Sequence, residues 1–138
     1  MVKGTSPKGL IDNVLTPYAD AYTMLKNSEY MASSRVDEIN GFLYWLNKID
    51  NYDWMPPAIK FFAEHPHDSE YVLWFVKKLE RLASFLHATA QDVNHRMDRY
   101  KWILAEMDSN PTHSLEQPLT SIELTANEKR SFYEALNG

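Results

Sequence analysis

The chain has 138 residues, of which 44% are hydrophobic and 24% charged, a balance typical of one globular domain. The absence of cysteine excludes disulfide scaffolds, thiolate metal sites and cysteine nucleophiles, and the net charge of −5 argues against a general binder of nucleic-acid backbones. No apolar run approaches the roughly 20 residues of a membrane span and residues 1–7 lack the apolar stretch of a secretory signal, so we expect a soluble, cytoplasmic protein with no membrane partner.

Helices fit this sequence better than strands. Only four glycines are present, so an all-β chain would lack its usual turn residues. From Ser6 to Leu25, apolar residues recur every three or four positions, which is the period of one helical face. Pro17 interrupts this pattern, and we expect a kink or a break in the helix there.

Two more helices are predicted before residue 65. Ser33 or Ser34 is the expected N-cap of the first, which would end within 47–51 and bury Val36, Ile39, Leu43, Leu46 and Ile49. Residues 53–57 predict a turn into a short second helix, because tandem prolines fit a first helical turn. We expect the inward face of this short helix to contain Ile59, Phe62 and Ala63.

The strongest periodic signal begins at Asp68, a favourable N-cap, and continues for about five turns. Its apolar face consists of Val72, Phe75, Val76, Leu79, Leu82, Ala83 and Leu86. Another helix is predicted from about Asp92, with an apolar side of Val93, Met97, Tyr100, Ile103, Leu104 and Met107. Together these two helices predict a central helical hairpin.

The end of the chain is predicted to be a loop followed by a helix. Residues 108–121 are rich in Asp, Ser, Asn, Pro and Thr, which indicates a loop. In 122–138 we expect a short extended piece and a terminal helix near 126–136, which begins with a Thr125–Glu128 capping box and has Gly138 as a possible C-cap. The prediction is therefore an all-α domain of five to seven helices, with the bundle in residues 1–107 and the terminal helix packed on it.

No motif predicts catalysis, a cofactor or a metal. Phosphate-binding glycine loops and nucleophile elbows are absent from the sequence. The densest histidine cluster, His65-Pro66-His67, has poor ligand spacing, so we expect it in a solvated loop or at a helix start. Glu80 is the best candidate for a perturbed carboxylate, but a neighbouring cation is expected to pair with it.

Basic residues gather weakly in one part of the chain. Residues 69–107 carry a net charge of +1 and the remainder −6. The candidate nucleic-acid contacts there are Lys77, Lys78, Arg81, Arg96, Arg99 and Lys101. A structural interpretation competes with this one: Arg96 would form an ion pair with an acid such as Glu80 while Tyr100 packs into the hairpin. The aromatic residues, including four tryptophans, are more typical of a core or an interface than of base stacking.

Three stretches resemble one known family. Residues 75–83 (FVKKLERLA) and 94–104 (NHRMDRYKWIL) are similar to the helical pair of GmrSD-type restriction proteins, in which a Leu-Glu-Arg helix precedes an Arg-x-x-x-Tyr-x-x-Ile-Leu helix. Residues 122–138 resemble the segment just before the carboxy-terminal HNH-type nuclease domain of that family. Asp53-Trp54 ahead of a short helix also fits, so the resemblance spans about residues 35–138.

In that family, an amino-terminal ParB-like domain with an Asp-Gly-Gln-Gln-Arg motif hydrolyses nucleotide, and the carboxy-terminal domain cuts DNA at a His-centred metal site. Neither motif occurs here; His113 lies in a superficially similar stretch but lacks the flanking ββα pattern. The resemblance therefore implies a middle helical domain without catalysis of its own, a fragment of a longer phage-defence protein that links two enzymatic domains and meets DNA through the full-length protein. The alternative is a protein-interaction or homo-oligomerisation module with no nucleic-acid role, which the acidic charge and the many aromatic residues favour.

Overall fold

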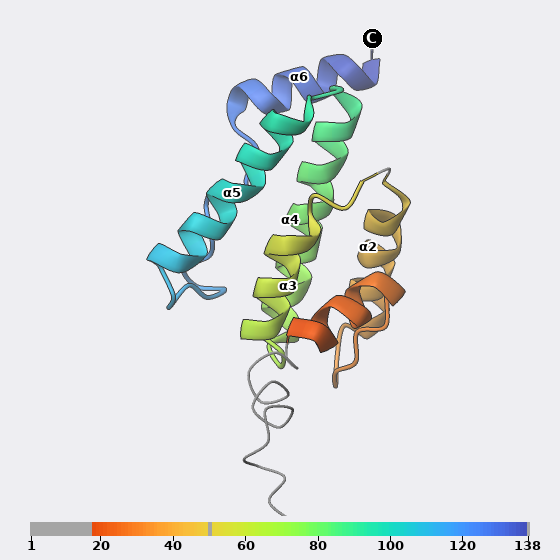
Figure 1. Cartoon of the computed structure of the whole chain (residues 1–138), viewed down its shortest axis with the longest axis vertical. Helices are drawn as coiled ribbons and strands as arrows, with labels where there is room; N and C mark the ends of the chain where they lie inside the picture. The colour runs from red at the N-terminus through yellow and green to blue at the C-terminus, as the bar shows by residue number, and fades with distance from the viewer. Residues whose placement is uncertain (1–17, 50, 138) are drawn as a thin grey trace, which may run out of the picture.

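A computed structural model of the protein describes residues 18–49 and 51–137 (Figure 1). These residues contain no strand and six helices: one over 18–27, then α2 (Val36–Lys48), α3 (Met55–Glu64), α4 (Ser69–Ala88), α5 (Val93–Ser109) and α6 (Ala126–Asn137). The predicted all-α class is confirmed. The expected break at Pro17, the helix before it and the possible cap at Gly138 lie outside the described residues. Within the described part of the chain, every helix is too short or too polar to cross a membrane.

Helix α4 is the centre of the fold. It begins where the sequence predicts, because the Asp68 carboxylate accepts a hydrogen bond of 3.2 Å from the backbone N–H of Tyr71. The helix packs against α2, α3 and α6. All of the apolar residues predicted for its inward face are buried, together with Tyr71, Leu73 and Phe85.

Helix α2 packs on α4 through its predicted apolar face but begins differently from the prediction. Ile39, Leu43 and Leu46 are fully buried. The N-cap is Arg35, in the left-handed region with φ of 62° and without a side-chain capping bond, so the expected cap at Ser33 or Ser34 is wrong. Arg35 instead donates to the carboxylates of Glu38 and Glu70 at 3.1 and 2.8 Å, which links the start of α2 to α4.

Helix α3 begins with the tandem prolines in its first turn, as predicted, but buries a different face. Phe62 is buried as predicted, but Ala58 and Phe61 are fully buried while Ile59 and Ala63 are only half-buried. The reason is that α3 packs against both α4 and α5. The Phe61 ring stacks on Phe75 of α4 with centroids 3.9 Å apart.

Helices α4 and α5 are antiparallel neighbours in the chain, but the hairpin between them is open (Figure 1). Asp92 caps α5 by accepting from the backbone N–H of His95 at 2.8 Å, as its position predicts. Beyond this start, α5 packs more closely on α3 than on α4. Val93 and Met97, predicted to face inward, are therefore 49% and 44% exposed.

After α5 the chain runs from 110 to 125 without regular structure and then forms α6, which lies across the end of α4 (Figure 1). The expected extended piece at 122–124 is a set of turns, among which Ile122 and Leu124 are buried. The capping box is confirmed: Glu128 N–H donates to Thr125 Oγ1 at 3.1 Å, and Thr125 N–H donates to the Glu128 carboxylate at 2.9 Å.

Candidate functional site

The first notable polar group is a buried arginine on α5, Arg99, which is only 2% exposed. Its Nε and Nη2 donate to the two carboxylate oxygens of Glu128 at 2.9 and 3.0 Å. Its two terminal nitrogens also donate to the backbone carbonyls of Ser121 and Glu123. A buried guanidinium needs such a complete set of acceptors, because a charge without partners is costly to desolvate. We call this set of contacts the Arg99 clamp; it fastens residues 121–128 to α5.

A carboxylate two turns further along α5 adds to this attachment. Glu106 accepts hydrogen bonds from the backbone N–H groups of Thr120 and Ser121, at 2.8 to 3.0 Å, and from both of their hydroxyls. Burial acts to raise the pKa of Glu106, but these hydrogen bonds outweigh it and hold the pKa below its usual range. The pKa of Glu128 is likewise lowered, since the Arg99 hydrogen bonds outweigh the opposing effect of burial.

The predicted pair of Glu80 and Arg96 is wrong. Arg96 donates at 2.8 Å to the Asp53 carboxylate and to the Gln91 carbonyl, while Glu80 accepts from the Ser84 hydroxyl at 3.0 Å. The open hairpin explains the difference, because α5 packs on α3 and Asp53 lies in the turn that leads into α3. Tyr100 is buried, as the structural interpretation of this region expects.

The six basic candidates for nucleic-acid contact do not form one surface. The clamp removes Arg99 from solvent, so that candidate is wrong for the fold described here, and Arg96 is half-buried beside Asp53. Lys78 pairs with Glu123 at 2.9 Å and lies over the Trp74 ring. The three exposed candidates without an ion pair among the described residues are Lys77, Arg81 and Lys101.

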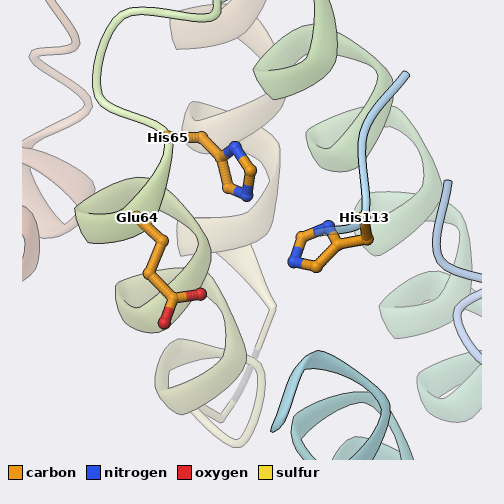
Figure 2. A group of neighbouring side chains, drawn as sticks. All are labelled: Glu64, His65 and His113. Atoms are coloured by element: carbon orange, nitrogen blue, oxygen red, sulfur yellow. The ribbon is translucent and has the colours of Figure 1, made fainter. Parts of the chain in front are cut away.

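A second polar group was missed by the sequence analysis. Glu64 and His65, at the end of α3, meet His113 from the segment after α5 (Figure 2). One nitrogen or oxygen atom from each side chain lies within 4.8 Å of the other two. Figure 2 shows the two imidazole rings and the carboxylate around a common space. We call these three residues the Glu64 cluster.

The hydrogen bonds of His113 are incomplete. Its Nδ1 lies 2.8 Å from the hydroxyl oxygen of Tyr71, which also accepts from the backbone N–H of Leu119 at 3.4 Å. Its Nε2 has no hydrogen-bond partner among the described residues. Water cannot easily take that place, because His113 is only 3% exposed. Since nearly all buried polar atoms in proteins are paired, such an atom is a candidate ligand-binding group.

The surroundings favour uncharged imidazoles. Burial lowers the pKa of both His65 and His113, and the proximity of the two rings, with centroids 4.8 Å apart, lowers that of His113 further. Burial also raises the pKa of Tyr71 to about 12, so its hydroxyl is neutral at physiological pH. Neutral imidazole is the form of histidine that binds a metal.

The spacing of histidines along the chain could not reveal this cluster. His65 and His113 are far apart in sequence, and His67, the neighbour considered with His65, is exposed and outside the cluster. The only local signal is that His65 follows Phe61 by one helical turn, which places it next to a buried aromatic residue; the ring centroids are 4.7 Å apart.

Comparison with known proteins assigns neither group of residues. No family model, curated protein or solved structure matches this chain. The Arg99 clamp and the Glu64 cluster are therefore interpreted from their own geometry and chemistry.

Proposed function

We propose that this chain is a non-catalytic helical connecting domain of a GmrSD-like, modification-dependent restriction or phage-defence protein. In this role it positions an amino-terminal nucleotide-hydrolysing domain and a carboxy-terminal HNH-type nuclease domain. The observation that carries the proposal is the Arg99 clamp, in which one buried side chain binds two backbone carbonyls and a carboxylate of the segment before and within α6.

The clamp supports a connecting role because it makes the attachment of α6 rigid. A bidentate arginine–carboxylate pair fixes orientation as well as distance, whereas a flexible linker lets its two ends rotate independently. The clamp also joins two of the stretches that carry the family resemblance, since Arg99 lies in one and Glu128 in the other. A domain that follows α6 would therefore keep a defined orientation to the bundle.

The outer surface of α6 supports the same role. No residue of this helix is buried, and Phe132 alone packs on the core, with its ring 5.9 Å from that of Phe85. Tyr133 and Leu136 are 70% and 68% exposed. Large apolar side chains on a short, otherwise polar helix are suited to contact with an adjoining domain.

The first experiment is to sequence the gene around this segment and to express the full reading frame. We expect an upstream Asp-Gly-Gln-Gln-Arg motif and a downstream HNH-type motif. In that full-length protein, Arg99→Met should leave nucleotide hydrolysis within about twofold and reduce nucleotide-dependent DNA cleavage about tenfold or more, because the coupling between the two domains is lost. Lys48→Met, which removes an exposed cation of α2 that is not among the candidate nucleic-acid contacts, is the control.

Two results would overturn the proposal. One is a reading frame that lacks both flanking domains. The other is an Arg99→Met protein in which the α6 segment is released but cleavage remains fully coupled to nucleotide hydrolysis.

A second candidate, an interaction or self-association module, is favoured by exposed aromatic residues away from α6. Tyr44 and Trp45 of α2 are 51% and 61% exposed and contact each other edge to face, with centroids 5.6 Å apart. If this surface mediates self-association, sedimentation velocity should show a concentration-dependent dimer that Trp45→Ser abolishes. A Trp102→Ser variant, which changes an exposed tryptophan of α5, is the control.

Direct DNA binding by this domain can be tested separately with the purified chain. Among the six candidates, Lys77, Arg81 and Lys101 are the exposed ones without an ion pair in the described residues, so they are the first to test for a DNA contact. Fluorescence anisotropy with modified and unmodified duplexes should then show binding that weakens steeply with salt and with Lys77→Ala. Absence of binding by the folded chain would leave DNA contact to the adjoining domains.

A further inference from the structure

We propose that Glu64, His65 and His113 form a binding site for one divalent transition-metal ion of the zinc type. The ion would be bound by His113 Nε2, an imidazole nitrogen of His65 and a carboxylate oxygen of Glu64. This inference is independent of the proposed connecting role, because none of the three residues belongs to the Arg99 clamp.

The donor set identifies the class of ion. Two imidazoles and one carboxylate form a typical protein site for zinc, in which a fourth position remains open to water or to another ligand. Calcium and magnesium prefer sets made of oxygen atoms, and this cluster offers only one carboxylate. The choice of ion therefore follows from two nitrogen donors and one oxygen donor, without any thiolate.

The distances are close to those that binding requires. The three potential ligand atoms lie within 4.8 Å of one another. In a tetrahedral zinc site with bonds of about 2.0 to 2.1 Å, ligand atoms are separated by roughly 3.4 Å. Rotations of the exposed Glu64 side chain and the half-buried His65 side chain would close this gap, while His113 stays in place.

His113 is already oriented as a ligand. His113 Nδ1 lies 2.8 Å from the Tyr71 hydroxyl oxygen, and in the tautomer that carries its hydrogen on Nδ1 the imidazole donates to that oxygen and leaves the lone pair of Nε2 free for the cluster. Such a hydrogen bond to the second ring nitrogen is the usual way in which proteins orient a metal-binding histidine. A metal ion would satisfy the buried Nε2, which otherwise has no partner among the described residues.

The local charge also permits a cation. Lys60 lies 2.8 Å from Oε2 of Glu64, but it also pairs with Asp108 at 3.2 Å, so two carboxylates surround one ammonium group. The second oxygen of Glu64, Oε1, makes no hydrogen bond among the described residues and remains available for the ion. A divalent ion would thus enter a neighbourhood in which two carboxylates, of Glu64 and Asp108, face the single ammonium group of Lys60.

Zinc titration by isothermal calorimetry, on chain first treated with a chelator, tests the site. We expect one zinc ion per chain and an affinity that falls about tenfold or more in Glu64→Gln and in His65→Gln. His67→Gln is the matched control, because His67 is exposed, two residues from His65 and outside the cluster. Zinc should also raise the thermal unfolding temperature of the wild-type chain and of His67→Gln more than that of the two ligand variants.

His113 needs a different readout, because replacing a buried residue that contacts Tyr71 can disturb folding. Nitrogen-15 NMR of the wild-type imidazoles should show the Nε2 signal of His113 shifting on zinc addition, with its Nδ1 remaining protonated. Three results would overturn the proposal: no binding, several weak sites whose affinity is unchanged in His65→Gln, or an equal loss of affinity in His67→Gln.

Discussion

The attachment of α2 to α4 and the attachment of the C-terminal segment to α5 show two different ways of joining helical elements. Helix α2 meets α4 through aliphatic residues that are fully buried, such as Ile39, Leu43 and Leu46. Residues 119–128 bury three apolar side chains, but charged hydrogen bonds also bind them to α5. Arg99 donates to this segment, and Glu106 accepts from it. The hydrophobic effect does not depend on the orientation of the side chains, so apolar burial allows several packing arrangements. The polar contacts, in contrast, fix which backbone atoms of the segment face α5.

The first prediction disrupts the apolar core around α4, on the side of that helix that contacts α3. Phe75→Ala removes the ring of α4 that stacks on Phe61 and should lower the free energy of unfolding by about 3 to 5 kcal/mol, because it leaves a cavity in the fully buried core. Urea denaturation followed by circular dichroism measures this loss. Tyr44→Ala, at an exposed site, should change stability by about 0.5 kcal/mol or less. A Phe75→Ala protein as stable as the wild type would contradict the packing described here.

The second prediction disrupts the polar side. Arg99→Met replaces the guanidinium by an unbranched apolar side chain, which leaves two carbonyls without their donor and Glu128 without its arginine partner, so we expect the free energy of unfolding to fall by about 3 kcal/mol. Unlike the core variant, it should act locally. Hydrogen exchange should show faster exchange of amides in 121–128 with little change in α2 and α4. Uniform loss of protection would mean that the segment and the core unfold as one unit.

The third prediction uses pH to weaken the polar attachment without mutation. The pKa values of Glu106 and Glu128 are lowered in the folded protein from an ordinary value of about 4.5. Their ionised forms thus contribute stability that is fully present above that ordinary value and is lost as the pH falls through the lowered folded pKa values. Urea denaturation from about pH 7 to about pH 3 should show this loss, and Glu106→Gln should reduce its slope. An unchanged slope in Glu106→Gln would show that other carboxylates are responsible; Glu116→Gln, at an exposed site, is the control.

Local features of the fold could be predicted from the sequence, whereas contacts between distant segments could not. The starts of α4, α5 and α6 were predictable because Asp68, Asp92 and the Thr125–Glu128 pair cap backbone groups within a few residues of themselves. The helical period likewise identified the buried face of α4. These signals are local, so they survive without knowledge of the neighbouring elements.

Contacts between distant segments could not be predicted in the same way. Arg99 looked like an exposed cation because its acceptors lie more than twenty residues away, in a loop without a periodic pattern. The same holds for Arg96 with Asp53 and for His65 with His113, whose proximity depends on how α3 packs against its neighbours. Residues whose role depends on tertiary packing are thus the ones for which sequence patterns were least informative.

The last prediction has the smallest expected effect on stability and compares an exposed ion pair of the C-terminal segment with the buried pair of Arg99 and Glu128. Lys78 of α4 pairs with Glu123 at 2.9 Å, but both side chains are accessible to water, so Lys78→Ala should cost only about 0 to 1 kcal/mol. The measurement is urea denaturation at low and at high salt, where the difference between wild type and variant should shrink as screening increases. If Lys78→Ala instead cost as much stability as Arg99→Met, the exposed pair would contribute as much to the attachment of the segment as the buried guanidinium does. A small, screened effect would show that, of the two cations that bind this segment, the buried guanidinium contributes more to the attachment, because its side chain is removed from solvent whereas that of Lys78 is not.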